Sequence, residues 1–304
     1  MEFSELIEEF LLSKRAQQKS HHTIAWYGDH LKVFYRWLAG QQKYRNPLAV
    51  QTIEAYYNYR RDSGVKPVTI HGDHRSLRVF YRWLRDDRNL IAESPVERIR
   101  MDKPDRDQPR RIDVDYYRSL MESIPPTNWV DLRDRMIISM LFLCGIRVGE
   151  AVGVMAKDVD VLAKTMRVRG KTGTRSVPLL PPVVEDIIAY IYVRPAYQTD
   201  HLLLSAKGDF TVRGLLTTNG VRQLLRRRAE QAGLEYFNPH AYRHGLAMHL
   251  LNKGGDMSLV QKVLGHSRIA TTAENYASWL TEDLNREFSA RMESAIKRKA
   301  KDKG

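Results

Sequence analysis

The sequence predicts a mainly α-helical protein of two domains, the second of which is α+β and combines helices with a small antiparallel sheet. The chain has 304 residues, which is enough for two hydrophobic cores. The segment 101–111 is dense in charge and proline, as is typical of an extended linker. Two short strand-like runs follow that segment. We therefore expect a first domain at 1–100, a linker at 101–110 and a second domain at 111–304.

Helices in the first domain are predicted by the helical spacing of its apolar side chains. The segments 23–38 and 69–84 share an opening Thr-Ile and the block Val-Phe-Tyr-Arg-Trp-Leu, and each forms an amphipathic pattern. Thr23 and Thr69 stand where N-caps are expected. Two further helices are expected at 3–11 and around 53–60. Two similar units are too few for a solenoid, so a small helical bundle is expected.

The chain carries an excess of positive charge, with 49 Lys and Arg against 36 Asp and Glu and a formal net charge of +13. Nucleic acid is the expected partner, and an anionic membrane is the alternative. No apolar run approaches the length of a membrane span, and the acidic segment 1–10 does not resemble a signal peptide. We therefore expect a cytoplasmic (nucleoid) protein without a membrane partner. Basic residues beside the aromatic stripes of the first domain are candidate phosphate contacts: Lys32, Arg36, Arg75, Arg78, Arg82 and Arg85.

The second domain opens with a predicted buried helix at 128–145 that ends at Gly145. Cys144, the only cysteine, lies in its apolar run and is interpreted as a core residue, which excludes a disulfide scaffold. The runs 165–170 and 174–180 predict a hairpin with Lys171 at its tip. Helices are then expected at 183–191 and 217–233. The latter bunches three basic residues that we interpret as phosphate contacts: Arg226, Arg227 and Arg228.

Two segments of the second domain carry residues suited to binding an anion. Arg147 follows the helix break at Gly145 and lies near the start of another helix, where backbone N–H groups attract anions. His240 and Arg243 are three residues apart on a helix that Pro239 opens, so they share a face that could grip a phosphate. His240 and His244 have the spacing of zinc ligands, but an intervening arginine disfavours a metal.

A third candidate segment, "LGHSRIATTAENY", presents His266 and Tyr276 on a polar stretch. A tyrosine hydroxyl with a pKa near ~10 is a poor nucleophile unless cationic groups assist it. Two arginines and two histidines in one pocket would provide that assistance. Lys171 at a hairpin tip could reach a substrate and give up a proton.

Taken in order along the chain, these residues resemble the tyrosine recombinase (phage integrase, Xer-like) family over nearly the whole sequence. The motifs that carry the resemblance are "RVGE", "GKTGTRSVPL", "HAYRH" and "LGHSRIATTAENY". Two departures are visible: Tyr242 stands where many members have leucine, and the interval from His266 to Tyr276 is one residue longer than in many members. The resemblance implies that the first domain is a SAM-like core-binding bundle and that the second is the catalytic domain.

The resemblance also implies a chemistry: Tyr276 attacks a DNA phosphate, forms a 3′-phosphotyrosyl bond and frees a 5′-hydroxyl. Arg147 and Arg243 would neutralise the non-bridging oxygens, and Lys171 would protonate the leaving oxygen. The remaining roles are implied for three residues: His240 orients or deprotonates the tyrosine, His266 binds a phosphate oxygen, and Glu150 orients its neighbours. No ATP, metal or other cofactor is implied.

The tail after Tyr276 repeats apolar residues every four positions, which predicts a helix at about 280–297. The resemblance implies that this helix docks into a neighbouring protomer, giving a tetramer on double-stranded DNA core sites that exchanges strands through a Holliday junction. Integration, transposition and resolution all fit. Two alternatives stay open: a type IB topoisomerase, and a catalytically silent site-specific DNA-binding protein.

Overall fold

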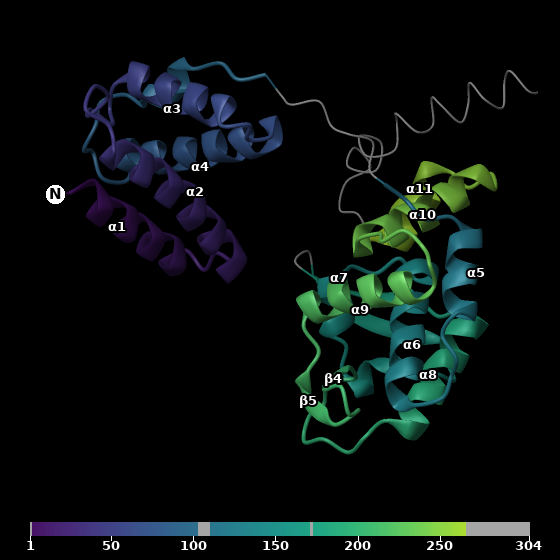
Figure 1. Cartoon of the computed structure of the whole chain (residues 1–304). Helices are drawn as coiled ribbons and strands as arrows, with labels where there is room; N and C mark the ends of the chain where they lie inside the picture. Colours follow the sequence, from purple (N-terminus) through teal and green to yellow (C-terminus); the bar gives the residue numbers. More distant parts are fainter. Residues whose placement is uncertain (1, 103–109, 171–172, 266–304) are drawn as a thin grey trace, which may run out of the picture. The chain divides into compact units, whose positions relative to one another are not determined.

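The computed structural model describes residues 2–102, 110–170 and 173–265. Its contacts divide the chain into two compact units, Met1–Arg106 and Asp107–Gly304. Both units are built mainly of helices, and antiparallel strands occur in the second (Figure 1). The predicted fold class is therefore confirmed. Within the described ranges, no helix is long and apolar enough to cross a bilayer.

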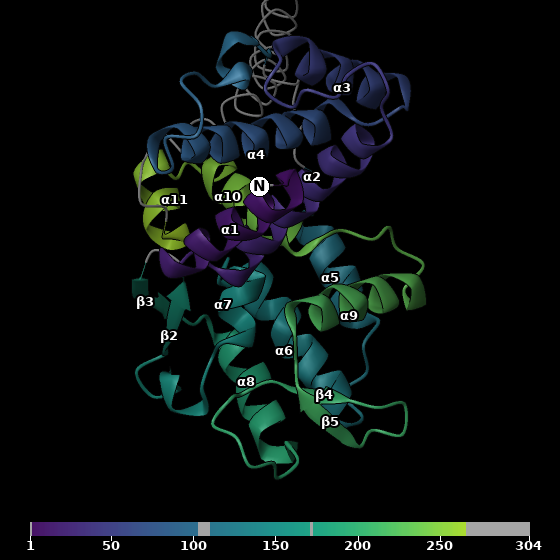
Figure 2. The same ribbon diagram turned by 90° about the vertical axis from the view of Figure 1, so that its left-hand side faces the viewer.

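The first unit is a bundle of four α-helices followed by a short 3₁₀ helix. The elements are α1 (Phe3–Ala16), α2 (His21–Ala39), α3 (Val50–Asp62), α4 (Pro67–Asp86) and η1 (Pro95–Arg98). α2 and α4, the two helices with the repeated motif, pack against each other, and α1 and α3 each contact both (Figure 2). The aromatic stripes form the core, in which Phe10, Phe34, Phe80 and Tyr81 are fully buried.

The predicted N-caps of α2 and α4 are wrong, because both helices begin about one turn earlier. Ser20 caps α2, and its hydroxyl accepts the backbone N–H of Thr23 at 3.2 Å. α4 begins with Pro67 at its first position after Lys66. The fixed φ of proline suits that position, where no backbone N–H is needed. Thr69 therefore lies inside the first turn of α4.

The second unit surrounds one central helix with further helices and two small sheets. Its helices are α5 (Val114–Glu122), α6 (Trp129–Leu143), α7 (Val148–Val152), η2 (Ala156–Asp158), α8 (Pro181–Val193), α9 (Thr218–Gln231), α10 (Pro239–Asn252) and α11 (Met257–Leu264). Its strands are β1 (Val159–Asp160), β2 (Thr165–Gly170), β3 (Gly173–Pro178), β4 (Leu204–Ala206) and β5 (Val212–Leu215). β2 and β3 form the predicted hairpin, and β1 extends their antiparallel sheet. The β4–β5 pair was not predicted, since its strands are too short to show an alternating pattern.

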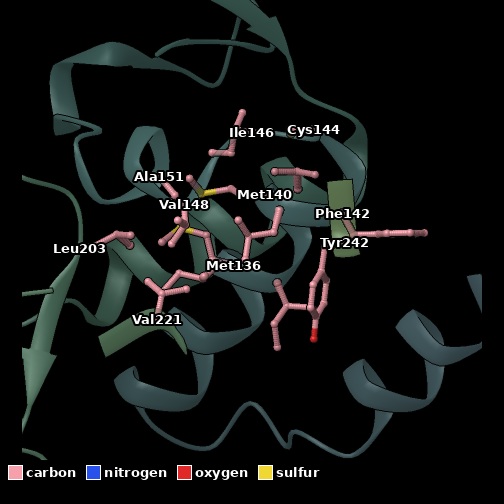
Figure 3. Close-up of a cluster of buried hydrophobic side chains, with 14 of the residues drawn as sticks. Met136, Met140, Phe142, Cys144, Ile146, Val148, Ala151, Leu203, Val221 and Tyr242 are labelled. Atoms are coloured by element: carbon pink, nitrogen blue, oxygen red, sulfur yellow. The ribbon is translucent and has the colours of Figure 1, made fainter. Parts of the chain in front are cut away.

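α6 is the centre of the second core and is buried along almost its whole length. α5, α8 and α10 contact it, and Figure 3 shows Met136 and Met140 of α6 among the apolar side chains around them. Cys144 is buried in this core as expected, and burial raises the pKa of its thiol to about 12. Tyr242 of α10 is also fully buried, so the residue that departs from the family pattern has a packing role.

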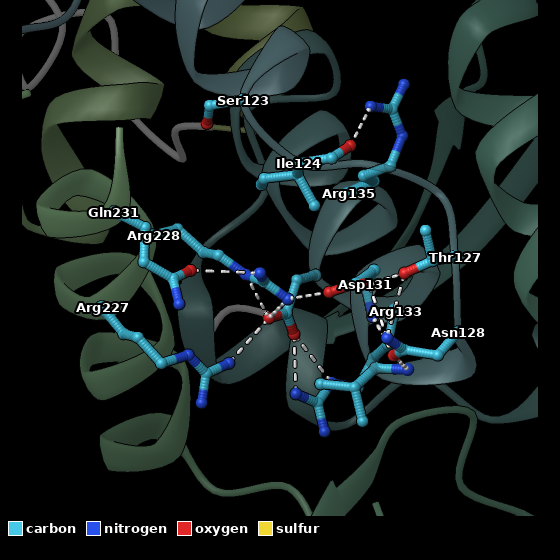
Figure 4. A network of polar contacts seen from close by, with 12 residues as sticks. Ser123, Ile124, Thr127, Asn128, Asp131, Arg133, Arg135, Arg227, Arg228 and Gln231 are labelled. Atoms are coloured by element: carbon cyan, nitrogen blue, oxygen red, sulfur yellow. Dashed lines mark hydrogen bonds and ion pairs between the residues drawn. The ribbon is translucent and has the colours of Figure 1, made fainter. Parts of the chain in front are cut away.

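A buried ionic network joins α6 to α9 and overturns one sequence interpretation (Figure 4). Arg228 points inward from α9, and its guanidinium pairs with Asp131 at 2.6 Å and with Asp134 at 2.8 Å. Arg133 donates two hydrogen bonds to Asp134 from the other side, at 3.0 and 2.6 Å. Arg228 is therefore a buried structural residue rather than a phosphate contact, because its charge is already compensated inside the unit.

Asp134→Asn is expected to destabilise the second unit by about 3–5 kcal/mol, because it leaves two buried guanidinium groups with too little negative charge. Equilibrium urea unfolding measures this loss. The matched control is Asp115→Asn, whose carboxylate pairs with Arg118 at the surface. That control should change the free energy of unfolding by less than about 0.5 kcal/mol. Equal stability of the two variants would contradict the structural role assigned to this network.

Candidate active site

Arg147 lies at the turn that joins α6 to α7. Gly145 ends α6 with a φ of +59°, a conformation that favours glycine. A Cβ atom there would also lie 2.7 Å from Leu246 and 2.8 Å from Leu264, so glycine permits the close approach of two other helices. Arg147 is the N-cap residue of α7. The turn thus holds the Arg147 side chain half-exposed at a helix N-terminus, as the sequence suggests.

The Glu150 carboxylate binds both the backbone N–H and the side chain of Arg147. The backbone N–H of Arg147 donates to one carboxylate oxygen of Glu150 at 2.9 Å, and its Nη1 donates to the other at 2.9 Å. Arg175 of β3 donates to the same two oxygens at 2.7 and 3.0 Å. Burial by itself would raise the pKa of Glu150, but these hydrogen bonds and charges bring it down to about 2. Glu150 is therefore ionised at neutral pH and holds two guanidinium groups.

Gly170 makes room for this carboxylate at the end of β2. A Cβ atom at Gly170 would lie 2.7 Å from Oε1 of Glu150. Gly170→Ala is therefore expected to displace Glu150 and, with it, Arg147. Misplacement of a catalytic group by an ångström costs up to about 100-fold in rate, and we expect a loss of about 10- to 100-fold in DNA cleavage.

Gly149→Ala is the matched control for Gly170→Ala, because a Cβ atom at Gly149 meets nothing within 4 Å. Gly149 lies inside α7, next to Glu150 in sequence, and alanine favours a helix. Single-turnover cleavage at saturating DNA compares the two variants. The assigned contact would be wrong if Gly170→Ala cleaved as fast as Gly149→Ala.

Arg243 lies within α10 with its side chain almost completely buried. Its Nη1 donates to the carbonyl oxygen of Gly145, two residues before Arg147. Its Nη2 donates to the carbonyl oxygen of Leu264 at 2.6 Å, two residues before His266 in the sequence. The guanidinium group therefore ties α10 to the turn that bears Arg147 and to the end of α11.

His240 occupies the first turn of α10. Asn238 caps this helix, and its side-chain oxygen accepts the N–H groups of His240 and Ala241 at 2.9 and 3.2 Å. His240 is exposed at the surface, but partial desolvation by its neighbours lowers the pKa of the ring. Nearby guanidinium charges lower it further, and they come from Arg243, Arg147 and Arg222. A neutral imidazole surrounded by cations can accept a proton, which suits a general base.

The zinc alternative for His240 and His244 gains no support from the described ranges. They contain no group of three His, Cys, Asp or Glu side chains placed to hold a metal ion. Burial lowers the pKa of His244 to about 4, and the neighbouring His240 and Arg243 add to this effect.

Several predicted residues lie outside the described residues: Lys171, His266, Tyr276 and the predicted helix at 280–297. The structure does describe the residues next to them. Gly170 and Gly173 pair across the hairpin at the base of its tip. Gly265 ends α11 in the left-handed conformation, with a φ of 64°.

The candidate phosphate contacts fall into two groups, one in each unit. Lys32, Arg36, Arg78 and Arg82 are exposed in the first unit, on α2 and α4. Arg226 and Arg227 are exposed on α9. Four of them have protein partners already: Arg36 donates to the backbone carbonyl of Lys32 at 3.3 Å, Arg82 pairs with Glu97 at 2.7 Å, Arg227 pairs with Asp134 at 2.9 Å, and Arg226 stacks over Tyr236 at 5.0 Å.

Two residues of the site, Arg175 and Arg222, were not predicted from the sequence. Arg175 interrupts the apolar face of its strand, and that break in the alternation is a signal that could have revealed it. Arg222 of α9 acts on His240 only through tertiary structure, and no local pattern distinguishes it from the other arginines of that helix.

Comparisons with known proteins identify the family of both units. The Phage integrase family model matches residues 110–282, and the model of the phage integrase N-terminal SAM-like domain matches residues 7–88. The tyrosine recombinase XerC of Rhodospirillum centenum is 32% identical over 266 residues, covering 83% of this chain and 76% of the relative. XerC of Staphylococcus aureus (strain MRSA252) is 29% identical over 274 residues, covering 88% of this chain and 90% of the relative.

Solved structures share the fold at lower identity. The XerH site-specific recombinase bound to a palindromic difH substrate matches with a TM-score of 0.71 and 21% identity, covering 93% of this chain and 83% of that one. The Tn1549 transposon integrase in complex with transposon right end DNA matches with a TM-score of 0.70 and 18% identity, covering 94% of this chain and 100% of that one.

Proposed function

Because the chain belongs to the phage integrase family and is a tyrosine-type site-specific DNA recombinase, we propose that its active site consists of Arg147, Lys171, His240, Arg243, His266 and Tyr276. The observation that carries this assignment is the convergence of the described members. Arg147 and Arg243 both act on His240, and Arg243 binds the turn that bears Arg147. This clustering of positive charge from distant parts of the chain supports a phosphodiester as the substrate.

In the proposed reaction, the Tyr276 oxygen attacks a DNA phosphorus and forms an O–P bond while the bond to the 5′-oxygen breaks. The phenol proton passes to His240, whose lowered pKa keeps it neutral and able to accept that proton. Lys171 donates a proton to the 5′-oxygen that leaves. Arg147 and Arg243 stabilise the charge that builds on the non-bridging oxygens, and His266 hydrogen-bonds one of them.

The second half-reaction reverses the first on a new strand. A 5′-hydroxyl of a partner duplex attacks the phosphotyrosine, restores a phosphodiester and releases Tyr276. The phosphotyrosyl bond conserves the energy of the broken bond, so the exchange needs no ATP. We expect it to proceed in a chelator such as EDTA, since guanidinium groups provide the positive charge that a metal supplies in many nucleases.

A suicide substrate tests this function. The probe is a nicked duplex carrying a site that the chain itself selects from random DNA. After attack, the short 5′-hydroxyl strand diffuses away, and the protein stays attached to DNA on a denaturing gel. Absence of any attached product would reject the proposal. Relaxation of supercoiled DNA that lacks a selected site would instead favour the type IB topoisomerase alternative.

We assign core-site binding on double-stranded DNA to both units, with 1–100 as the SAM-like core-binding domain and 111–304 as the catalytic domain. The support is the match of the SAM-like model to residues 7–88 and the DNA complexes of the XerH and Tn1549 proteins. The exposed basic residues are proposed to contact phosphates: Lys32, Arg36, Arg78, Arg82, Arg226 and Arg227. Such a protein would act in the cytoplasm, at the nucleoid.

The segment at about 280–297 is proposed to dock into a neighbouring protomer and to support a tetramer on two DNA sites. Truncation after Ser278 should therefore leave cleavage of a single suicide site largely intact but reduce synaptic complexes by about 10-fold, which corresponds to about 1.4 kcal/mol of assembly free energy. Native gel shifts with two labelled duplexes measure this. Unchanged assembly of the truncated chain would contradict the docking role.

A further inference from the structure

Arg175 occupies an unusual position in β3. In the register of the hairpin, Met166 faces Val177 and Val168 faces Arg175. The first three of these side chains are buried, so this face of the hairpin is the one that packs on the core. Because side chains alternate along a strand, Arg175 stands where an apolar residue would be expected.

The guanidinium group of Arg175 is directed at Glu150. Its Nη1 and Nη2 each donate to a different carboxylate oxygen, at 2.7 and 3.0 Å, which is the bidentate geometry that binds a carboxylate most strongly. The same two oxygens accept the backbone N–H and the Nη1 of Arg147. One buried carboxylate is thus shared by two arginines.

The surrounding backbone packs closely against Arg175 and Glu150. A Cβ atom at Gly265 would lie 2.6 Å from both Cδ and Nε of Arg175, so the backbone after α11 lies directly on the arginine stem. A Cβ atom at Gly170 would collide with the carboxylate from the hairpin side. The Arg175 side chain is only 20% exposed as a result.

The charges of the three side chains do not cancel. Glu150 carries one negative charge, and Arg147 and Arg175 carry one positive charge each. If Glu150 had Arg147 as its sole partner, the pair would be neutral and would attract a phosphate weakly. We propose that Arg175 is a positioning residue that neutralises Glu150, so that Arg147 keeps a net positive charge for the scissile phosphate. This inference rests on the proposed function.

Two simpler roles fit the observations less well. A direct phosphate contact is disfavoured, because Gly265 covers the Arg175 stem and both Nη atoms bind a charged carboxylate, with which a phosphate would have to compete. The Nη atoms of Arg243 instead donate to neutral carbonyl groups, which do not compensate its charge. A purely stabilising role is disfavoured because a buried ion pair is often no more stable than packed apolar side chains, and Val177 shows that this face accepts them. Neutralisation of Glu150 explains why an arginine stands there.

The test is a double-mutant cycle that removes the charges of Glu150 and Arg175. Each variant is measured by its single-turnover rate of covalent attachment to a nicked suicide duplex at saturating DNA. Arg175→Met should slow attachment by about 100-fold, comparable to the loss of one transition-state donor, because Glu150 then neutralises Arg147. Adding Glu150→Gln to Arg175→Met removes that negative charge. The double variant should therefore attach at least about 10-fold faster than Arg175→Met alone, a non-additive result.

A methylphosphonate at the scissile position gives a second readout. It replaces a charged non-bridging oxygen with a methyl group and so reduces the need for the Arg147 charge. On this substrate the deficit of Arg175→Met should shrink from about 100-fold to below about 10-fold, whereas a general loss of structure would slow both substrates equally.

Arg167→Met is the matched control, since Arg167 lies on the opposite face of the same hairpin with a side chain that is 60% exposed. It should attach within about threefold of the unchanged chain, as expected of a surface substitution. If Arg175→Met does not fold, as judged by near-UV circular dichroism, Arg175→Gln replaces it in the same cycle. Failure of Glu150→Gln to restore either variant would overturn the proposal.

The same experiment separates this inference from the proposed function. If the unchanged chain forms no covalent adduct, the recombinase active site itself is wrong. If the unchanged chain attaches to DNA and Arg175→Met attaches equally fast, only the role of Arg175 is rejected.

Discussion

Tyr276→Phe is expected to bind its DNA site with unchanged affinity and to form no covalent adduct. Phenylalanine keeps the ring and loses only the hydroxyl oxygen, which is the atom proposed to bond to phosphorus. No rate should remain above background, because the 3′-phosphotyrosine cannot form without that oxygen. Gel shifts at several salt concentrations measure the affinity, and a denaturing gel after incubation with the nicked duplex measures the adduct.

Tyr192→Phe is the appropriate control, since Tyr192 is 90% exposed on α8. It should bind and cleave as the unchanged chain does. Continued cleavage by Tyr276→Phe would show that another residue is the nucleophile and would contradict the role assigned to Tyr276. Loss of DNA binding along with cleavage would leave the chemical role of Tyr276 unsupported, because affinity should not depend on one hydroxyl group.

Arg243→Lys is expected to reduce the rate of covalent attachment by about 100- to 1,000-fold, or roughly 3–4 kcal/mol of transition-state stabilisation. Lysine retains the charge but cannot bridge two carbonyl oxygens with a planar fork. The carbonyl groups of Gly145 and Leu264 would lose their shared donor. The segments that precede Arg147 and His266 would then be held less firmly against α10.

This substitution should also lower the free energy of unfolding by about 1–3 kcal/mol, since a buried carbonyl group without a donor is costly. Arg118→Lys, at a surface position paired with Asp115, is the matched control and should alter neither quantity. Single-turnover kinetics and urea unfolding, measured on the same preparations, distinguish the two contributions. Attachment by Arg243→Lys at the rate of the control would show that its planar fork is dispensable.

Local sequence patterns were sufficient for the main outline of the fold. Apolar side chains at helical spacing predicted the helices of the first unit, and two strand-like runs around Lys-Thr-Gly predicted the β2–β3 hairpin. The motifs around Arg147, Lys171, His240 and Tyr276 identified the family, which the comparisons establish. These predictions succeed because periodicity and motif spacing are properties of neighbouring residues, which the sequence contains in full.

Local sequence patterns did not determine where a helix begins or which charged side chains are buried. Ser20 caps α2 and Pro67 opens α4, whereas Thr23 and Thr69 were the expected caps. Several residues near a helix start can satisfy its free N–H groups, and the sequence alone does not show which residue does so. Three consecutive arginines of α9 look alike in the sequence. Only their rotation about the helix axis buries Arg228 against two carboxylates and leaves Arg226 and Arg227 exposed, although Arg227 still reaches Asp134.

The sequence by itself thus determined the elements, the family and the types of residue available for the chemistry. Tertiary structure alone decided which charges meet. Glu150 pairs with Arg175, which lies 25 positions later in the sequence, and Arg243 binds the carbonyl oxygen of Gly145, which lies 98 positions earlier. The electrostatic energy of a side chain depends on distance and burial in space, and neither is encoded in the local order of residues.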